Sequence, residues 1–272
     1  MFGFIARRVL TAIPTAFMAA SLVFFCARIL PGDPALAILG DSASAEALAV
    51  LREKLGLNLP ILTQYADFVV NLLHFDLGVS MINGRQTIDL IVEVLPYTME
   101  LTAFAVGFGV VLGVPLGIVA ALHNRGPIDF VARIISLMGL SCPPFFLGIC
   151  FILMFSILFP IFPVIGSADA VDAMGRLKML IPPGVTLGIT FLAFVARSAR
   201  ASVLGVMPEQ FVRTARMKGI AENAVVFRHI VRNALLPIIT VSGLYFGILL
   251  GNAVITEVVF TRPGLGKLII GA

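Results

Sequence analysis

The sequence predicts an all-α protein that crosses a membrane several times, and two features of its composition support this. Of its 272 residues, 59% are apolar and 12% are charged. Soluble domains are about 45–50% apolar and about a quarter charged. The basic residues are also unevenly distributed, because residues 197–232 hold seven basic and two acidic side chains, a net +5, whereas the whole chain carries +4. A polytopic membrane protein with one basic segment on its cytoplasmic side fits both features.

Five apolar runs are long enough to cross about 30 Å of hydrocarbon, which takes about 20 helical residues. They cover residues 9–30, 98–122, 130–160, 182–203 and 235–256. The first exceeds the roughly 7–15 residues of a signal-peptide core and lacks a small-residue cleavage site, so we expect a retained transmembrane helix. The third contains Cys142-Pro143-Pro144 and should bend there, because proline removes a helix hydrogen bond. A last run from Leu265 is too short to cross the membrane, and we expect it to begin a sixth span.

The runs divide the chain into an N-terminal transmembrane helix (1–30), an extracytoplasmic helical segment (31–97) and a core (98–272). Short loops rich in Lys and Arg stay in the cytoplasm. Arg7 and Arg8, the 123–129 loop and the 197–234 segment fall on one side if the spans alternate. This pattern predicts a cytoplasmic N-terminus.

Segment 31–97 should fold outside the cytoplasm, since it carries eight acidic residues against three basic ones. Ser44 is a suitable cap for a first helix that Gly56 would end, and a second helix should begin at Pro60. The two helices either lie on the membrane surface alone or also contact a soluble partner. The sequence leaves both possibilities open.

Glycines recur every fourth residue in two of the apolar runs. The two stripes are Gly109, Gly113 and Gly117, and Gly243, Gly247 and Gly251, with a shorter pair at Gly184 and Gly188. On a helix this spacing lines bare backbone along one face, which permits close helix packing in lipid. We favour helix packing at both stripes over a face that lines a passage.

The basic segment 205–232 has the signals of two short helices joined by a corner. Pro208 suits a first helical turn and Glu209 the positive end of a helix dipole. Phe211 and Ala215 should share a face, and Gly219 should end the helix before a second one starts at Glu222. Such a segment fits the groove of another protein. The alternative is a loop that sets topology and touches anionic lipid.

The sequence around this corner resembles the cytoplasmic coupling segment of ABC-importer permeases, and most closely the dipeptide, oligopeptide and nickel branch. The matching motifs are Arg213-Thr214-Ala215-Arg216-Met217-Lys218-Gly219, Arg232-Asn233-Ala234-Leu235-Leu236-Pro237, Leu30-Pro31-Gly32-Asp33-Pro34, Gly56-Leu57, Asp76-Leu77-Gly78-Val79-Ser80 and Arg262-Pro263-Gly264-Leu265-Gly266. The general importer pattern has Glu-Ala-Ala before the glycine, where this chain has Arg213, Thr214 and Ala215. Leu236-Pro237 also falls five residues later than in that pattern, and both departures are typical of the peptide branch.

The resemblance implies a permease subunit in a bacterial cytoplasmic (inner) membrane that imports dipeptides or oligopeptides. Its implied partners are a homologous second permease, two ATP-binding cassette subunits, an extracytoplasmic substrate-binding protein and membrane lipid, with no nucleic acid. The implied ATPase-coupling residues are Glu209, Phe211, Arg213, Thr214, Ala215, Arg216, Lys218 and Gly219. The chain has no Gly-rich phosphate-binding motif, so we expect no catalytic residue and no bound cofactor, with ATP and Mg²⁺ used by the partners.

Other functions fit less well. The same family also imports nickel or other small solutes, and the sequence does not separate these cargoes. His74, His123 and His229 lie far apart, which argues against an intramembrane enzyme, and the spacing of the three cysteines resembles no metal site. We expect those cysteines to be buried apolar side chains. A channel or secondary transporter usually carries an ionisable residue at mid-membrane depth, whereas Glu100 lies near the edge of its run.

Overall fold

The computed structural model describes residues 2–29, 34–40, 43–80, 84–162 and 173–271. These residues are helical almost throughout, apart from turns and a single β-bridge between Val79 and Gln86. The all-α prediction is therefore confirmed for the described residues. Most of the motif Leu30-Pro31-Gly32-Asp33-Pro34 lies outside them.

The chain separates into two units, Met1–Ile88 and Asp89–Ala272. The first unit contains α1 (Phe2–Ile29), α2 (Pro34–Leu39), α3 (Ala45–Lys54) and α4 (Ile61–Leu73). Helix α5 (Thr87–Leu122) leads into the second unit, which continues with α6 (Pro127–Ser141), α7 (Pro144–Ile152), η1 (Leu153–Leu158), α8 (Ala173–Val206), α9 (Gln210–Met217), α10 (Glu222–Ala224), η2 (Val225–Val231), α11 (Arg232–Val259) and α12 (Leu265–Ile270).

Aromatic packing joins α1 to α4 in the first unit. The ring of Phe24 lies 5.0 Å from that of Phe68, and Phe25 lies 5.0 Å from Tyr65. Tyr65 also hydrogen-bonds Ser21 over 2.8 Å. As expected, Ser44 caps α3, Gly56 follows it with a φ of 64°, and Pro60 precedes α4. The proposed helical pair in this segment is thus present as α3 and α4.

Four helices are long and apolar enough to cross a membrane: residues Ala6–Arg28, Thr87–Leu122, Met174–Val206 and Glu222–Val259. The expected bend at Cys142-Pro143-Pro144 is present and sharp, because the helices on its two sides diverge by 98°. The predicted third run at 130–160 is therefore broken into two helices at its prolines. Counted as one broken span, this pair gives a fifth crossing.

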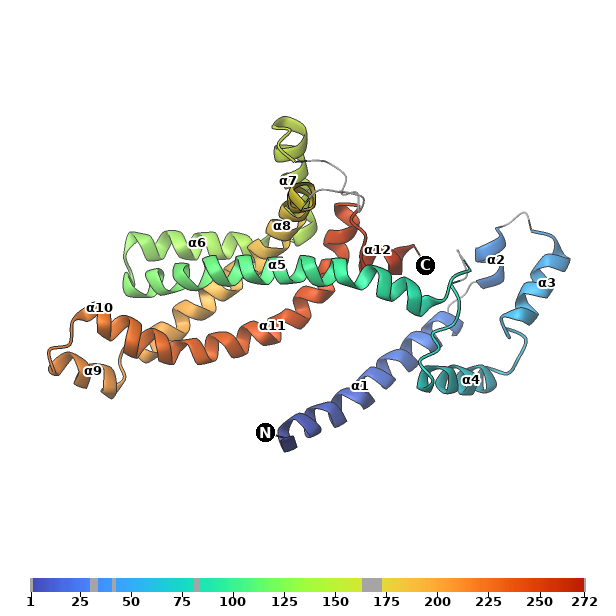
Figure 1. Ribbon diagram of the computed structural model, residues 1–272, viewed down its shortest axis with the longest axis horizontal. Coiled ribbons are helices and arrows are strands. Elements are labelled where there is room, and N and C mark those ends of the chain that lie inside the picture. Colours follow the sequence, from blue (N-terminus) through green and yellow to red (C-terminus); the bar gives the residue numbers. More distant parts are fainter. Residues whose placement is uncertain (1, 30–33, 41–42, 81–83, 163–172, 272) are drawn as a thin grey trace. The chain divides into compact units, whose positions relative to one another are not determined.

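The second unit is built on α8, which packs against α6, α7 and α11. Its core includes Leu101, Leu187, Phe191, Val195 and Leu249, all fully buried. The α5–α6 loop and the α9–α10 segment lie at one end of the long helices, and α12 lies at the other (Figure 1). Alternating crossing helices produce this arrangement, in which both basic loops share one end.

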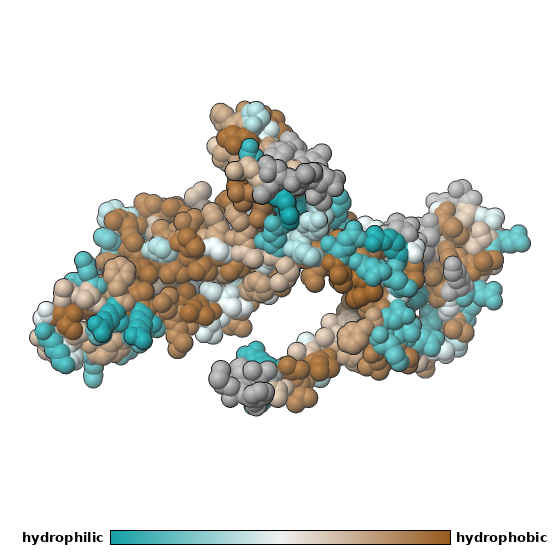
Figure 2. Space-filling model, viewed as in Figure 1, coloured by the Kyte–Doolittle hydropathy of each residue, from teal (hydrophilic) through white to brown (hydrophobic). Residues whose placement is uncertain are grey.

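Apolar side chains cover much of the outer surface of α5, α6 and α11, while hydrophilic residues gather around α9 and α10 (Figure 2). Leu236, Leu244 and Ile239 on α11 are each more than 60% exposed. Cys26 and Cys150 are also exposed and Cys142 is half-buried, so the prediction of buried cysteines is wrong for the chain alone. These surfaces need lipid or other subunits to cover them.

The two glycine stripes have different surroundings. A Cβ atom at Gly113 would lie 2.8 Å from the carbonyl oxygen of Leu192 and 3.1 Å from the Cβ of Val195, and Gly109 and Gly117 are equally close to α8. At Gly243, Gly247 and Gly251 an added Cβ would meet no atom within 4 Å. Close packing is thus found for the α5 stripe, whereas no described helix of the second unit packs on the α11 stripe.

Candidate functional site

The segment between α8 and α11 forms a short helical hairpin at one end of the second unit (Figure 1). Helix α8 ends at Val206, and Met207 and Pro208 lie in a turn. Pro208 therefore precedes the helix rather than lying in its first turn as predicted. Glu209 is the N-cap residue of α9, although its side chain makes no capping hydrogen bond. Its charge still favours this end of the helix dipole.

One face of α9 anchors the hairpin to the rest of the chain. Val212 and Ala215 are buried in the main core, beside Val203 of α8 and Val225 and Ile230 of η2. Phe211 is 43% exposed, in contrast to these two residues. Phe211 lies one helical turn before Ala215 in α9, as the predicted common face requires, but only Val212 and Ala215 are buried. The same core therefore connects α9 to α8 and η2.

Gly219 forms the corner after α9. Its φ is 74°, and its N–H donates to the carbonyl of Arg216 over 2.9 Å, while the Ile220 N–H donates to Ala215 over 3.4 Å. These two bonds form a Schellman motif, which satisfies the last carbonyls of a helix and uses a left-handed residue that is usually glycine. The predicted sequence of helix, glycine corner and helix is therefore present.

Arg216 and Glu222 form an ion pair across this corner. The guanidinium donates two hydrogen bonds to the carboxylate, over 2.6 and 3.1 Å. Hydrogen bonding to Glu222 raises the pKa of Arg216 above its usual value. Both side chains are exposed, so the pair contributes little to the stability of the fold. Its bidentate geometry nevertheless restricts the angle between α9 and the helix that follows.

The outer surface of the hairpin combines exposed apolar and basic side chains. We call this the tip surface: Phe211, Met217, Ile220 and Phe227 are apolar, and Arg213, Lys218 and Arg228 are basic. Thr214 is also exposed and hydrogen-bonds the Gln210 carbonyl over 2.9 Å. Aromatic anchors with a charged rim are typical of surfaces that bind another protein. The sequence analysis missed Phe227 and the role of Val212.

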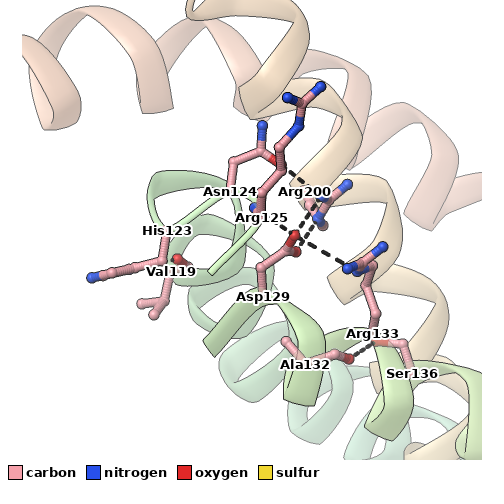
Figure 3. Close-up of polar contacts among 9 residues, drawn as sticks. All are labelled: Val119, His123, Asn124, Arg125, Asp129, Ala132, Arg133, Ser136 and Arg200. Atoms are coloured by element: carbon pink, nitrogen blue, oxygen red, sulfur yellow. Dashed lines mark hydrogen bonds and ion pairs between the residues drawn. The ribbon is translucent and has the colours of Figure 1, made fainter. Parts of the chain in front are cut away.

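A buried carboxylate fastens α6 to α8 near the same end (Figure 3). The Asp129 side chain is 1% exposed and accepts hydrogen bonds from Arg200 Nη2 over 2.8 Å and from the Arg125 backbone N–H over 3.0 Å. Arg200 also donates to Asn124 over 3.0 Å. We call the four residues Asn124, Arg125, Asp129 and Arg200 the clasp. Its acid and base are 71 positions apart, so their pairing was not evident from the sequence.

A second polar cluster lies at the opposite end, where α11 meets the loop before α12. Glu257 is fully buried and accepts hydrogen bonds from the Thr98 hydroxyl over 2.5 Å and from the Gly266 N–H over 2.7 Å. Arg262 donates to Glu100 over 2.7 Å, and burial lowers the pKa of Arg262 while Glu100 opposes that change. The sequence analysis missed Glu257, which lies just beyond its last complete span. The sequence could have indicated Glu257, because this residue lies just before the motif Arg262–Gly266.

Comparison with known proteins gives consistent matches across the chain. Residues 113–272 match the model of the family described as binding-protein-dependent transport system inner membrane component, and residues 1–102 match that family's N-terminal model. A relative from Brucella suis biovar 1, which bears the name of a peptide transport system permease protein, is 38% identical over 100% of this chain and 87% of its own length. The glutathione transport system permease protein GsiC of Escherichia coli O6:H1 is 39% identical over 99% of this chain and 86% of its own length.

A solved structure supports the same fold. The crystal structure of an amino acid ABC transporter with histidines matches 67% of this chain and 78% of its own chain, with a TM-score of 0.52. The sequence identity is 23%, so this likeness concerns the fold alone.

Proposed function

Because this chain belongs to the binding-protein-dependent transport system inner membrane component family, we propose that it is a permease subunit of an ATP-driven importer whose cargo is a peptide. The observation that carries the peptide assignment is the full-length similarity to permeases named for peptide and glutathione transport. Glutathione is itself a tripeptide, so both names point to short peptides.

The partners in this proposal are a homologous second permease, two ATPase subunits and an extracytoplasmic binding protein. The open glycine stripe of α11 supports a second permease, because closely spaced small residues favour helix–helix contact in lipid. The chain itself would hydrolyse no ATP and bind no cofactor, and ATP with Mg²⁺ would be used by the ATPase subunits.

The hairpin at residues 205–232 is the proposed ATPase-coupling site. Phe211 is suited to enter a groove on an ATPase subunit, with Arg213, Lys218 and Arg228 at the rim. Glu209, Thr214 and Arg216 would hold the hairpin in shape around it. Val212 and Ala215 connect the hairpin to the core, so a push on α9 would reach α8 and α11 as one movement. Gly219 sets the angle of that connection.

The proposed location is a bacterial inner membrane, with the N-terminus and the hairpin in the cytoplasm. The bent pair α6–α7 would count as one crossing, which gives five. The test is thiol labelling in intact cells after removal of the three native cysteines. We expect Asn223→Cys to be protected from a membrane-impermeant reagent and Asn58→Cys to be labelled; labelling of both from the same side would contradict this orientation.

The functional test is peptide uptake by liposomes that contain both permeases and both ATPases. We expect uptake of a radiolabelled tripeptide only when ATP is inside the liposome and the loaded binding protein is outside. ATP hydrolysis should appear only with the ATPase subunits present. Uptake without ATP would instead favour a secondary transporter or a channel, and uptake of nickel but not of peptide would overturn the peptide assignment.

A further inference from the structure

A cavity of about 240 Å³ lies between α5, α6 and α8, beside the clasp. Its wall is apolar along Leu116, Leu137 and Leu140, and three arginines, Arg133, Arg197 and Arg200, also line it. Leu137 is 59% exposed, so the cavity opens at the outer surface of α6. This apolar cavity with three guanidinium groups is distinct from the hairpin proposed to couple the chain to the ATPase subunits.

The arginines are not fully neutralised by the chain. Arg200 is engaged by Asp129 in the clasp. Arg133 is 3.6 Å from the same carboxylate, but its side chain is 52% exposed. Arg197 is exposed and has no ion pair with any acidic residue in the described part of the chain. The cavity thus has three guanidinium groups and one neighbouring carboxylate, and its excess positive charge lies at Arg133 and Arg197.

The cavity is polar at one end and apolar at the other. Helices α6 and α8 run antiparallel, since Asp129 meets Arg200 near the α5–α6 loop, whereas Gly139 meets Ala193 further along. Arg133 therefore lies nearer the loop and Leu140 further into the span, and Figure 3 shows the guanidinium groups of Arg133 and Arg200 both directed toward the Asp129 carboxylate. This order matches a phospholipid, whose phosphate lies at the interface and whose acyl chains extend into the hydrocarbon.

We propose that this cavity binds an anionic phospholipid of the cytoplasmic leaflet. The phosphate lies against Arg133 and Arg197, whose planar guanidinium groups suit bidentate phosphate contacts, and an acyl chain lies along Leu137 and Leu140. Basic pockets between transmembrane helices on the cytoplasmic side are known to recognise lipid headgroups. The clasp keeps Arg200 on Asp129, which leaves the other two arginines for the lipid. The choice of leaflet depends on the proposed orientation, but the binding chemistry does not.

The test is native mass spectrometry of the purified importer complex, titrated with phosphatidylglycerol and, separately, with phosphatidylcholine. We expect phosphatidylglycerol to bind the permease and to bind roughly thirtyfold more weakly in the double variant Arg133→Gln, Arg197→Gln. The matched control, Arg176→Gln with Lys178→Gln, removes two positive charges near the other end of α8 and should keep wild-type affinity. The double variant Arg133→Lys, Arg197→Lys retains charge and should lose much less affinity than the Gln pair.

Three results would overturn the proposal. Equal binding of phosphatidylcholine would show that the arginines do not select charge. Wild-type affinity in the Gln pair would place the lipid elsewhere. Binding to the isolated chain but not to the complex would mean that the second permease covers the cavity. Inorganic phosphate at millimolar concentration should not displace the lipid, because the apolar wall contributes to binding. Lipid binding is measured without transport, so failure of peptide uptake leaves this result unchanged.

Discussion

The glycine stripes of α5 and α11 have the same spacing but opposite roles in the chain. On α5 the glycines allow α8 to approach so closely that a Cβ at Gly113 would lie 2.8 Å from a backbone oxygen. On α11 an added Cβ at Gly243, Gly247 or Gly251 would meet nothing within 4 Å. Lipid tails do not drive helices together, so helices in a membrane associate through van der Waals contact. Both glycine stripes favour such contact because they let another helix approach the backbone closely. The difference teaches that equal spacing does not fix the neighbour: the α5 stripe packs against α8, and the α11 stripe is open to the second permease proposed above.

The largest effect should come from filling the closed stripe. Gly113→Leu forces a side chain into the backbone of α8, and such overpacking costs roughly 1–3 kcal/mol or occasionally more. We expect a lower midpoint in thermal unfolding of the detergent-purified chain. Gly243→Leu is the matched control on α11 and should lower the midpoint much less, because no atom lies within 4 Å of an added Cβ there. Equal midpoints for the two variants would remove the distinction between the stripes.

The clasp should be the next most sensitive feature, because it holds α6 against α8 near Gly117. Arg200→Gln leaves the buried carboxylate of Asp129 without its main partner, so we expect clear destabilisation. Adding Asp129→Asn removes the unpaired charge and should restore part of the lost stability. The comparison uses the same thermal unfolding assay. A double variant less stable than the single one would show that the charge pair is not the important element.

Filling the open stripe should affect assembly instead of folding. Gly247→Leu meets no atom of its own chain, so the stability of the subunit should change by less than about 0.5 kcal/mol. We expect less of the second permease to co-purify, or a stalled transport cycle. Gly3→Leu is a useful control, since Gly3 also has open space around it but belongs to α1. Wild-type assembly and uptake by Gly247→Leu would mean that the stripe faces lipid.

The same distinction between inner and outer contacts applies to α9, where smaller effects are expected. Val212 faces the core, whereas Phe211 is exposed on the tip surface. Phe211→Ala should reduce co-purification of the ATPase subunits, since a buried aromatic anchor can contribute about 2 kcal/mol or more to binding. Arg228→Glu should matter less if Arg228 lies at the rim. The reverse order, with a dependence of ATP hydrolysis on anionic lipid, would indicate that the segment binds lipid.

Sequence patterns predicted the local features of this chain better than its contacts. The cap at Ser44, the corner at Gly219 and the bend at Pro143 depend on a few neighbouring residues, and each is present. Which side of α9 is exposed depends on its packing against η2. The sequence alone therefore did not show that Val212 is buried and Phe211 is exposed. The pairs Asp129–Arg200 and Thr98–Glu257 join distant helices. Spacing alone also cannot show which glycine stripe meets its own chain.

The central claim is that the hairpin at residues 205–232 transmits ATPase closure to the permease. Gly219 has a φ of 74° with no atom within 4 Å of an added Cβ, so valine there would be opposed by the backbone conformation alone. Asparagine tolerates this conformation, which makes Gly219→Asn the matched control. The measurement is ATP hydrolysis and tripeptide uptake in liposomes, with and without loaded binding protein. We predict that Gly219→Val assembles but hydrolyses ATP independently of the binding protein and imports little peptide, while Gly219→Asn retains coupling. Normal, coupled uptake by Gly219→Val would contradict the account.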